Sequence, residues 1–150
     1  MMTSLNLNIQ IYRPLQQVFM FVTTPENDFL WQYSTLASDK ISKGEMGIGT
    51  LIRTVAHFME RRIESIYEVT EFELDKRYEI TSLSGPVDSR TLYTFESLQN
   101  RTKINISTET NPRGILKTDS LMVERKFRKQ YKENLALLKN ILETPQIAQA

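Results

Sequence analysis

The sequence has 150 residues, no cysteine and a single histidine. Without cysteine the chain can form no disulfide bond, no thiolate metal site and no cysteine nucleophile. The one histidine, His57, cannot by itself supply a His/Cys metal cluster or a Cys–His catalytic pair. We therefore expect no metal and no cofactor.

The chain also has no excess of one charge and no long apolar run. Nineteen basic residues against eighteen acidic ones give a formal net charge of +1, whereas a domain that binds nucleic acid usually carries a clear basic excess. No apolar stretch approaches the roughly 20 residues that a membrane span requires. We expect a cytoplasmic protein with no nucleic-acid partner and no transmembrane segment, and the sequence predicts no oligomeric state.

Glycine is scarce as well, with five residues, of which three lie between Gly44 and Gly49. A phosphate-binding loop needs a strand before its glycines and a helix start after them. Here a strand-like stretch follows the glycines, and no Gly-Lys-Ser/Thr sequence is present. We interpret this segment as a turn between strands.

The rest of the chain shows three patterns in succession. Residues 5–11 alternate between apolar and polar side chains, which is typical of a strand with one buried face. Two short helical segments follow, Leu15–Val22 and a second one that begins after Thr24, which is placed as its N-cap. Five strands of an antiparallel meander are then predicted, at Thr50–Met59, Arg62–Phe72, Tyr78–Leu83, Arg90–Leu98 and Lys103–Thr110.

The last third is predicted to be one long helix that starts between Arg113 and Ser120 and ends near Glu143. Its apolar side chains recur at helical spacing: Val123, Phe127, Tyr131, Leu135, Leu138 and Leu142. The fold class is therefore α+β, with a single helix-grip domain over residues 1–150. A curved antiparallel sheet wraps around the long C-terminal helix, and two short helices follow the first strand.

Three stretches support a family resemblance: Arg13–Phe19 continuing through Pro25–Asn27 to Trp31, Gly47–Thr50 with Tyr67–Glu73, and Leu135–Glu143. Together they resemble the START-related (SRPBCC, birch-pollen-allergen-like) superfamily, in particular its polyketide cyclase/dehydrase branch. The resemblance implies a helix-grip fold with a cavity. It implies no single reaction, because members include lipid carriers, hormone receptors, cyclases, quinone-binding proteins and chaperone activators, so function must be argued from the site.

Candidate ligand-binding residues are polar and aromatic side chains on inward faces. In the strand 50–59 we place Thr54 and Phe58 inward, which turns His57 outward. Glu124 lies within the apolar stripe of the long helix, where it either pairs with Arg128 or faces a cavity. The predicted ligand-binding residues are Trp31, Thr54, Phe58, Tyr93, Phe95, Glu124, Phe127 and Tyr131. For the phenylalanines Phe95 and Phe127, ordinary core packing is the alternative.

The leading hypothesis is binding or transport of a small hydrophobic ligand such as a lipid, isoprenoid, quinone or polyketide-like compound. The mostly apolar cavity would lie between the sheet and the C-terminal helix, with its entrance near residues 25–33 and 44–49. One alternative is a cyclase or dehydratase in which Glu124 acts with Tyr93 or Tyr131 in acid–base chemistry. Another is a protein-interaction module with a packed core. No catalytic residue is assigned.

Overall fold

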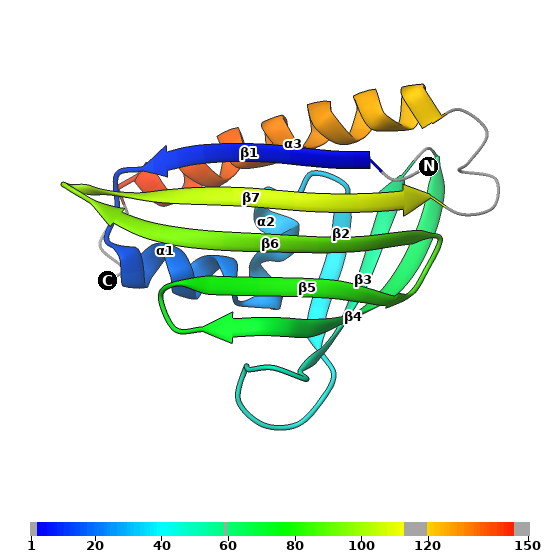
Figure 1. Ribbon diagram of the computed structural model, residues 1–150, viewed down its shortest axis with the longest axis horizontal. Helices are drawn as coiled ribbons and strands as arrows, with labels where there is room; N and C mark the ends of the chain where they lie inside the picture. The colour runs from blue at the N-terminus through cyan, green and yellow to red at the C-terminus, as the bar shows by residue number, and fades with distance from the viewer. Residues whose placement is uncertain (1–2, 59, 113–119, 146–150) are drawn as a thin grey trace.

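The computed structural model describes residues 3–58, 60–112 and 120–145, which form one antiparallel sheet covered by helices on one side (Figure 1). The sheet has seven strands in the order β1-β7-β6-β5-β4-β3-β2. Each strand from β2 to β6 therefore pairs with the next one along the chain, and the last strand, β7, also pairs with β1. The predicted meander is confirmed.

The elements follow one another in this order. The first strand β1 (Thr3–Ile11) leads into α1 (Leu15–Val22), a 3-10 turn η1 (Pro25–Asn27) and α2 (Asp28–Trp31). Six strands and the long helix follow: β2 (Thr35–Lys40), β3 (Leu51–Phe58), β4 (Arg61–Glu73), β5 (Arg77–Ser84), β6 (Val87–Leu98), β7 (Arg101–Pro112) and α3 (Ser120–Glu143).

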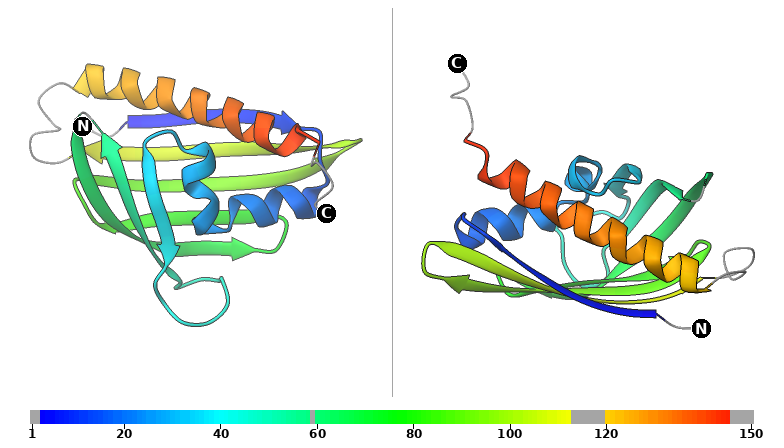
Figure 2. Two further views of the ribbon diagram at one scale, coloured as in Figure 1. Left: turned by 180° about the vertical axis from the view of Figure 1, so that it is seen from behind. Right: turned by 90° about the horizontal axis from the view of Figure 1, so that it is seen from above.

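All three helices lie on the same face of the curved sheet (Figure 2). The helix α3 runs across this face, and α1 and α2 lie beside it. The core is formed where α1 and the C-terminal half of α3 meet the sheet. There the ring of Phe19 contacts the rings of Phe72 and Phe95 edge to face, at centroid distances of 5.6 and 4.9 Å. Each such buried side chain contributes about 1.5–3 kcal/mol to the stability.

The predicted apolar stripe of α3 is confirmed in its C-terminal half, where Leu135, Leu138 and Leu142 are buried. The side chain of Val123 lies outside the described residues. No helix in the described ranges is long and apolar enough to span a membrane.

The C-terminal end of α3 is held by polar contacts with the end of β1. The ammonium group of Lys139 donates hydrogen bonds to the carbonyl of Gln10 (2.6 Å) and to the carboxylate of Glu143 (2.7 Å). The Tyr12 amide also donates to Glu143, at 2.9 Å. Partial desolvation raises the pKa of Glu143, but these hydrogen bonds and the nearby positive charges outweigh it and lower the pKa below its usual value. The contacts fix the position of the helix over the sheet.

Two local features differ from the sequence-based expectations. Strand β2 was not predicted, because residues Thr35–Lys40 show no alternation of apolar and polar side chains. The strand lies at the edge of the sheet, and its pairing with β3 has a register shift between Thr35 and Ala37. Thr24 lies at the N-cap position of η1 with Pro25 after it, as predicted, but its side chain makes no capping hydrogen bond there. Its hydroxyl donates to the carbonyl of Met20 (2.6 Å), so it closes the end of α1 instead of capping the next turn.

Candidate ligand-binding pocket

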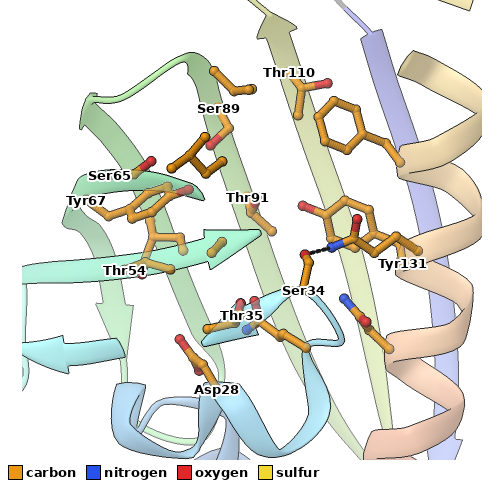
Figure 3. A pocket seen from close by; sticks show the side chains of 18 of the residues that line it. Asp28, Ser34, Thr35, Thr54, Ser65, Tyr67, Ser89, Thr91, Thr110 and Tyr131 are labelled. Atoms are coloured by element: carbon orange, nitrogen blue, oxygen red, sulfur yellow. Dashed lines mark hydrogen bonds between the residues drawn. The ribbon is translucent and has the colours of Figure 1, made fainter. Parts of the chain in front are cut away.

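A pocket of about 150 Å³ lies between the sheet, α2 and the N-terminal half of α3 (Figure 3). It is lined by residues from α2, the segment that joins α2 to β2, the strands β2 to β7, and α3. The core described above occupies the other end of the same strands. The pocket is therefore the part of the sheet–helix interface that side chains leave open.

Strand register explains which side chains reach the pocket. On β3 and β4, Thr54 pairs with Ser65 and Ala56 pairs with Ile63, and all four line the pocket. Alternate residues of a strand share a face, so the inward positions continue along each strand.

The inward-facing side chains of β6 and β7 change from apolar to hydroxyl-bearing along the length of each strand. On β7, buried Ile104 and Ile106 give way to Thr108 and Thr110. On β6, Phe95 and Tyr93 likewise give way to Thr91 and Ser89. On β6 and β7 the large apolar residues thus lie toward the core end, and most of the hydroxyls lie toward the pocket end.

Hydroxyl groups predominate among the lining side chains. Ten of them line the pocket: Ser34, Thr35, Thr54, Ser65, Tyr67, Ser89, Thr91, Tyr93, Thr110 and Tyr131. Aliphatic and purely apolar aromatic side chains are fewer than these hydroxyl-bearing ones. The pocket can therefore make many more hydrogen bonds than an apolar cavity.

Several of these hydroxyls are hydrogen-bonded to one another. Tyr67 bonds to Ser65 and Ser89, and its burial raises the pKa of the phenol, so it remains protonated at neutral pH. The hydroxyl of Thr91 lies 2.9 Å from that of Thr108, which in turn lies 3.5 Å from the phenol of Tyr131 on α3. These bonds hold side chains from the sheet and the helix in fixed positions around the space.

Two hydrogen bonds join α3 to the segment before β2. Gln130 donates through Nε2 to the hydroxyl of Ser34, as the dashed line in Figure 3 shows. The Oδ1 of buried Asn134 accepts a hydrogen bond from the Tyr33 amide at 2.8 Å. Both Gln130 and Asn134 line the pocket, so these contacts close one of its sides.

Among the described residues that line the pocket, Asp28 is the only one with a carboxyl group and none is basic. Burial raises the pKa of Asp28 from 3.8 to about 8; a hydrogen bond from Ser38 opposes this rise and the charge of Glu26 adds to it. Asp28 is therefore mostly protonated at neutral pH. The hydroxyl of Ser38 also lies 2.9 Å from that of Thr54, so a chain of hydrogen bonds links the carboxyl to the strand β3.

Two buried polar atoms of the lining have no hydrogen-bond partner in the described part of the chain. They are the indole nitrogen Nε1 of Trp31 and the hydroxyl oxygen of Thr110, in side chains that are 2% and 4% exposed. Buried polar groups are nearly always paired, and an unpaired one costs about 1–3 kcal/mol. In residues 3–58, 60–112 and 120–145, no group of three His, Asp or Glu side chains could hold a metal ion.

Solved structures resemble this chain over nearly its whole length. A START superfamily protein from Mycobacterium smegmatis superposes with a TM-score of 0.81 at 10% sequence identity, covering 93% of this chain and 97% of the other. The fold of this chain is the START-like helix-grip fold. The family resemblance inferred from the sequence is thereby confirmed for the fold.

Two further structures share the START-like fold of this chain. Ara h 8.0201 superposes with a TM-score of 0.71 at 11% identity, over 94% of this chain and 97% of the other. The Zhui aromatase/cyclase from Streptomyces sp. R1128 superposes with a TM-score of 0.74 at 11% identity, over 95% of this chain and 92% of the other. No protein-family model and no curated protein matches the sequence itself.

Within this START-like fold, five of the eight predicted ligand-binding residues line the pocket: Trp31, Thr54, Tyr93, Phe127 and Tyr131. Of the expected entrance, the segment 25–33 contributes Asp28, Trp31 and Gln32, whereas residues 44–49 contribute no lining residue.

The other three predicted residues lie elsewhere or are not described. Phe95 packs against Phe19 in the core, because it lies at the apolar end of β6. Glu124 is not among the lining residues. Its carboxylate Oε1 lies 3.7 Å from the guanidinium Nη2 of Arg128. Of the two alternatives expected for Glu124, the structure therefore shows the local ion pair. The side chain of Phe58 lies outside the described residues. His57 is exposed, as predicted.

The sequence analysis missed most of the hydroxyl lining and the carboxyl group of Asp28. The lining it missed includes Ser65, Tyr67, Ser89, Thr91 and Thr110. The sequence does contain a pattern that indicates these residues. Each lies an even number of positions from a buried apolar residue of the same strand, so both side chains point to the same face of the sheet. For Asp28 we find no such signal, since an acidic residue at the start of a helix is common on protein surfaces.

Proposed function

We propose that this protein binds a small organic molecule in the pocket between its sheet and α3. The observation that supports this proposal is the pocket itself, a space of about 150 Å³ beside an otherwise packed core. The alternative function, a protein-interaction module, assumes a core that is packed throughout, whereas this core leaves a pocket open. START-like folds place their helix over a curved sheet, and this chain keeps part of the enclosed space open.

The size of the pocket restricts the ligand. A volume near 150 Å³ is comparable to an engineered protein cavity of about 150 Å³ that holds a benzene molecule. Of the ligand classes that the sequence suggested, the ring-sized ones, such as the head group of a quinone or part of a polyketide-like compound, match this space. A long lipid chain would fit only if α3 moved away from residues 33 and 34.

Native mass spectrometry of the freshly purified protein, with an organic extract of the same sample, tests the proposal. We expect a retained small molecule with the wild-type chain. The variant Ala56→Phe fills the pocket and should lose the molecule, because Ala56 lines the space. The variant His57→Phe is the matched control, since this neighbouring side chain is exposed, and it should retain the molecule.

Equal retention by both variants would contradict binding in this pocket. If the extract is empty, the same pair of variants can be compared by thermal shift against a panel of ring-sized compounds. A panel in which no compound stabilises the wild-type chain would count against the proposed function.

Asp28 supports a second candidate function, acid–base catalysis in the same pocket. Its raised pKa of about 8 would let it give a proton to a bound substrate at neutral pH. In this proposal Asp28 takes the role that the sequence analysis considered for Glu124. A carbon-13 titration of the Asp28 carboxyl tests it. An ordinary carboxyl pKa in the ligand-free protein would remove the basis for this candidate.

A further inference from the structure

The carboxyl group of Asp28 lines the pocket without a positive group to balance it. Asp28 keeps some accessible surface, and Figure 3 shows it at one end of the pocket. Among the described lining residues none is Lys, Arg or His, and the neighbouring charge that acts on the carboxyl is the negative one of Glu26. Charged side chains that leave water are nearly always paired. The described part of the chain therefore leaves this carboxyl beside an open space without a counter-ion.

The hydrogen bonds of the Asp28 carboxyl leave room for a ligand. When ionised, the carboxyl accepts a hydrogen bond from the Ser38 hydroxyl. That hydroxyl has a single proton, so the Thr54 hydroxyl, which lies 2.9 Å away, donates to Ser38 in turn. A carboxylate can accept about four hydrogen bonds. Acceptor positions of Asp28 are thus available to donors that enter the pocket.

Phenol groups of the sheet lie within electrostatic reach of Asp28. Burial raises the pKa of Tyr67, Tyr78 and Tyr93, and the charge of Asp28 adds to the rise. The phenols therefore stay neutral at mildly alkaline pH, and Tyr67 and Tyr93 line the pocket. Neutral hydroxyl oxygens accept hydrogen bonds from N–H donors, and aromatic rings attract cations. This lining suits a positive group and does not suit a negative one.

We infer that the pocket takes a molecule of about one ring that carries a protonated amine, and that the amine forms an ion pair with Asp28. This inference rests on the proposed function and narrows its ligand class. The ammonium group supplies the counter-ion that the lining lacks, and its three N–H donors match the carboxylate and the hydroxyls around it. An uncharged molecule supplies no counter-ion, and an anion would lose its hydration without gaining one.

Binding of the amine is coupled to the proton of Asp28. The ligand-free carboxyl has a pKa of about 8, so near pH 7 it has to release its proton before it can pair with an ammonium ion. We expect the affinity to fall roughly tenfold for each pH unit below about 8. The other titratable groups around Asp28 are Glu26 on η1 and the phenols of Tyr67, Tyr78 and Tyr93. The phenols stay protonated in this range, and Glu26 does not line the pocket.

Three probes of similar shape test the inference: benzylamine, benzyl alcohol and benzoate. Isothermal titration calorimetry in two buffers of different ionisation enthalpy gives both the affinity and the number of protons released. At about pH 8 we expect benzylamine to bind roughly tenfold more tightly than benzyl alcohol, and benzoate to bind more weakly still. At about pH 7, about one proton should leave the protein for each benzylamine bound.

The variant Asp28→Asn removes the charge and keeps the size of the side chain. Its affinity for benzylamine at about pH 8 should fall roughly tenfold and its proton release should stop, whereas benzyl alcohol should bind as before. Asp39→Asn is the matched control. Asp39 lies 3.6 Å from Arg53, with both side chains well exposed, and it does not line the pocket. This control should leave the affinity and the proton release unchanged, and thermal unfolding checks that both variants fold.

The possible outcomes distinguish the inference from the proposed function. Benzyl alcohol or benzoate binding as tightly as benzylamine would overturn the inference, as would unchanged benzylamine affinity in Asp28→Asn, while small-molecule binding itself would stand. Binding of none of the three probes would overturn the inference and also count against the proposed function.

Discussion

The side chain of Gln130 on α3 is hydrogen-bonded to the hydroxyl of Ser34, at the point where the chain enters β2. Four residues further along the helix, Asn134 accepts a hydrogen bond from the Tyr33 amide. Loss of these two hydrogen bonds would let α3 separate from residues 33 and 34, which would widen the pocket.

The first prediction concerns this separation. Gln130→Met removes the hydrogen bond to Ser34 with little change in side-chain volume, so ligand entry and exit should both become faster while affinity changes little. Exchange rates measured by NMR with a bound probe test this. Ser34→Ala should have the same effect, and it should add nothing in the Gln130→Met background if the two side chains act through one contact. Fully additive effects would contradict this interpretation.

The second prediction concerns pH. Between the ordinary pKa of Asp28, 3.8, and its value in the folded protein, about 8, the folded protein keeps a proton that the unfolded chain has released. The contribution of Asp28 to the free energy of unfolding should therefore fall as the pH rises through this interval, and become constant above it.

The variant Asp28→Asn cannot titrate and should remove this contribution. Near pH 4 the variant and the wild type should have similar stability. Near pH 9 the variant should be more stable by several kcal/mol, because each pKa unit corresponds to about 1.4 kcal/mol. Urea unfolding at both pH values measures the difference. Parallel pH profiles for the two proteins would show that Asp28 titrates normally.

The third prediction concerns the turn between β5 and β6. Gly85 has a positive φ of 124°, and a Cβ at this position would lie 2.4 Å from the hydroxyl oxygen of Ser65 in the pocket. We expect Gly85→Ala to destabilise the fold by about 1–3 kcal/mol and to weaken ligand binding, since Ser65 must move. Gly47→Ala is the control, because no atom lies within 4 Å of its Cβ position. Thermal unfolding should show little change for this control.

The fourth prediction concerns the attachment of α3 to β1. Lys139→Met removes the hydrogen bonds to Gln10 and Glu143 and should lower the stability by about 1 kcal/mol, because the groups are partly exposed to solvent. The pKa of Glu143 should rise toward its ordinary value, since Lys139 helps to lower it. Chemical denaturation and a carboxyl NMR titration measure the two effects. An unchanged Glu143 pKa would show that the Tyr12 amide and the charge of Arg13 are sufficient to lower it.

Much of the fold could be predicted from the sequence because its signals are local. The alternation in residues 5–11 and the apolar stripe from Leu135 to Leu142 each identify one element and its buried face. Strand β2 gave no such signal. It forms an edge, and its pairing with β3 depends on a register shift that no pattern within six residues can show.

The site could be predicted only in part, because it depends on which end of a strand remains unpacked. Tyr93 and Phe95 share one face of β6, and both were predicted to bind a ligand. Only Tyr93 lines the pocket, because α1 brings Phe19 against Phe95. That contact joins residues 76 positions apart, and no periodicity in either segment indicates it. The buried state of Asp28 is a tertiary effect of the same kind.

The change from apolar to hydroxyl side chains along β6 and β7 separates two sets of residues within one sheet. Side chains such as Phe19, Phe95 and Ile104 pack the core at one end, and those at the other end line the pocket. Ser89 or Thr91 can therefore be exchanged for other residues, which changes the lining of the pocket, while the aromatic packing keeps the backbone in place. A shared architecture at 10% sequence identity is what such a division of labour permits.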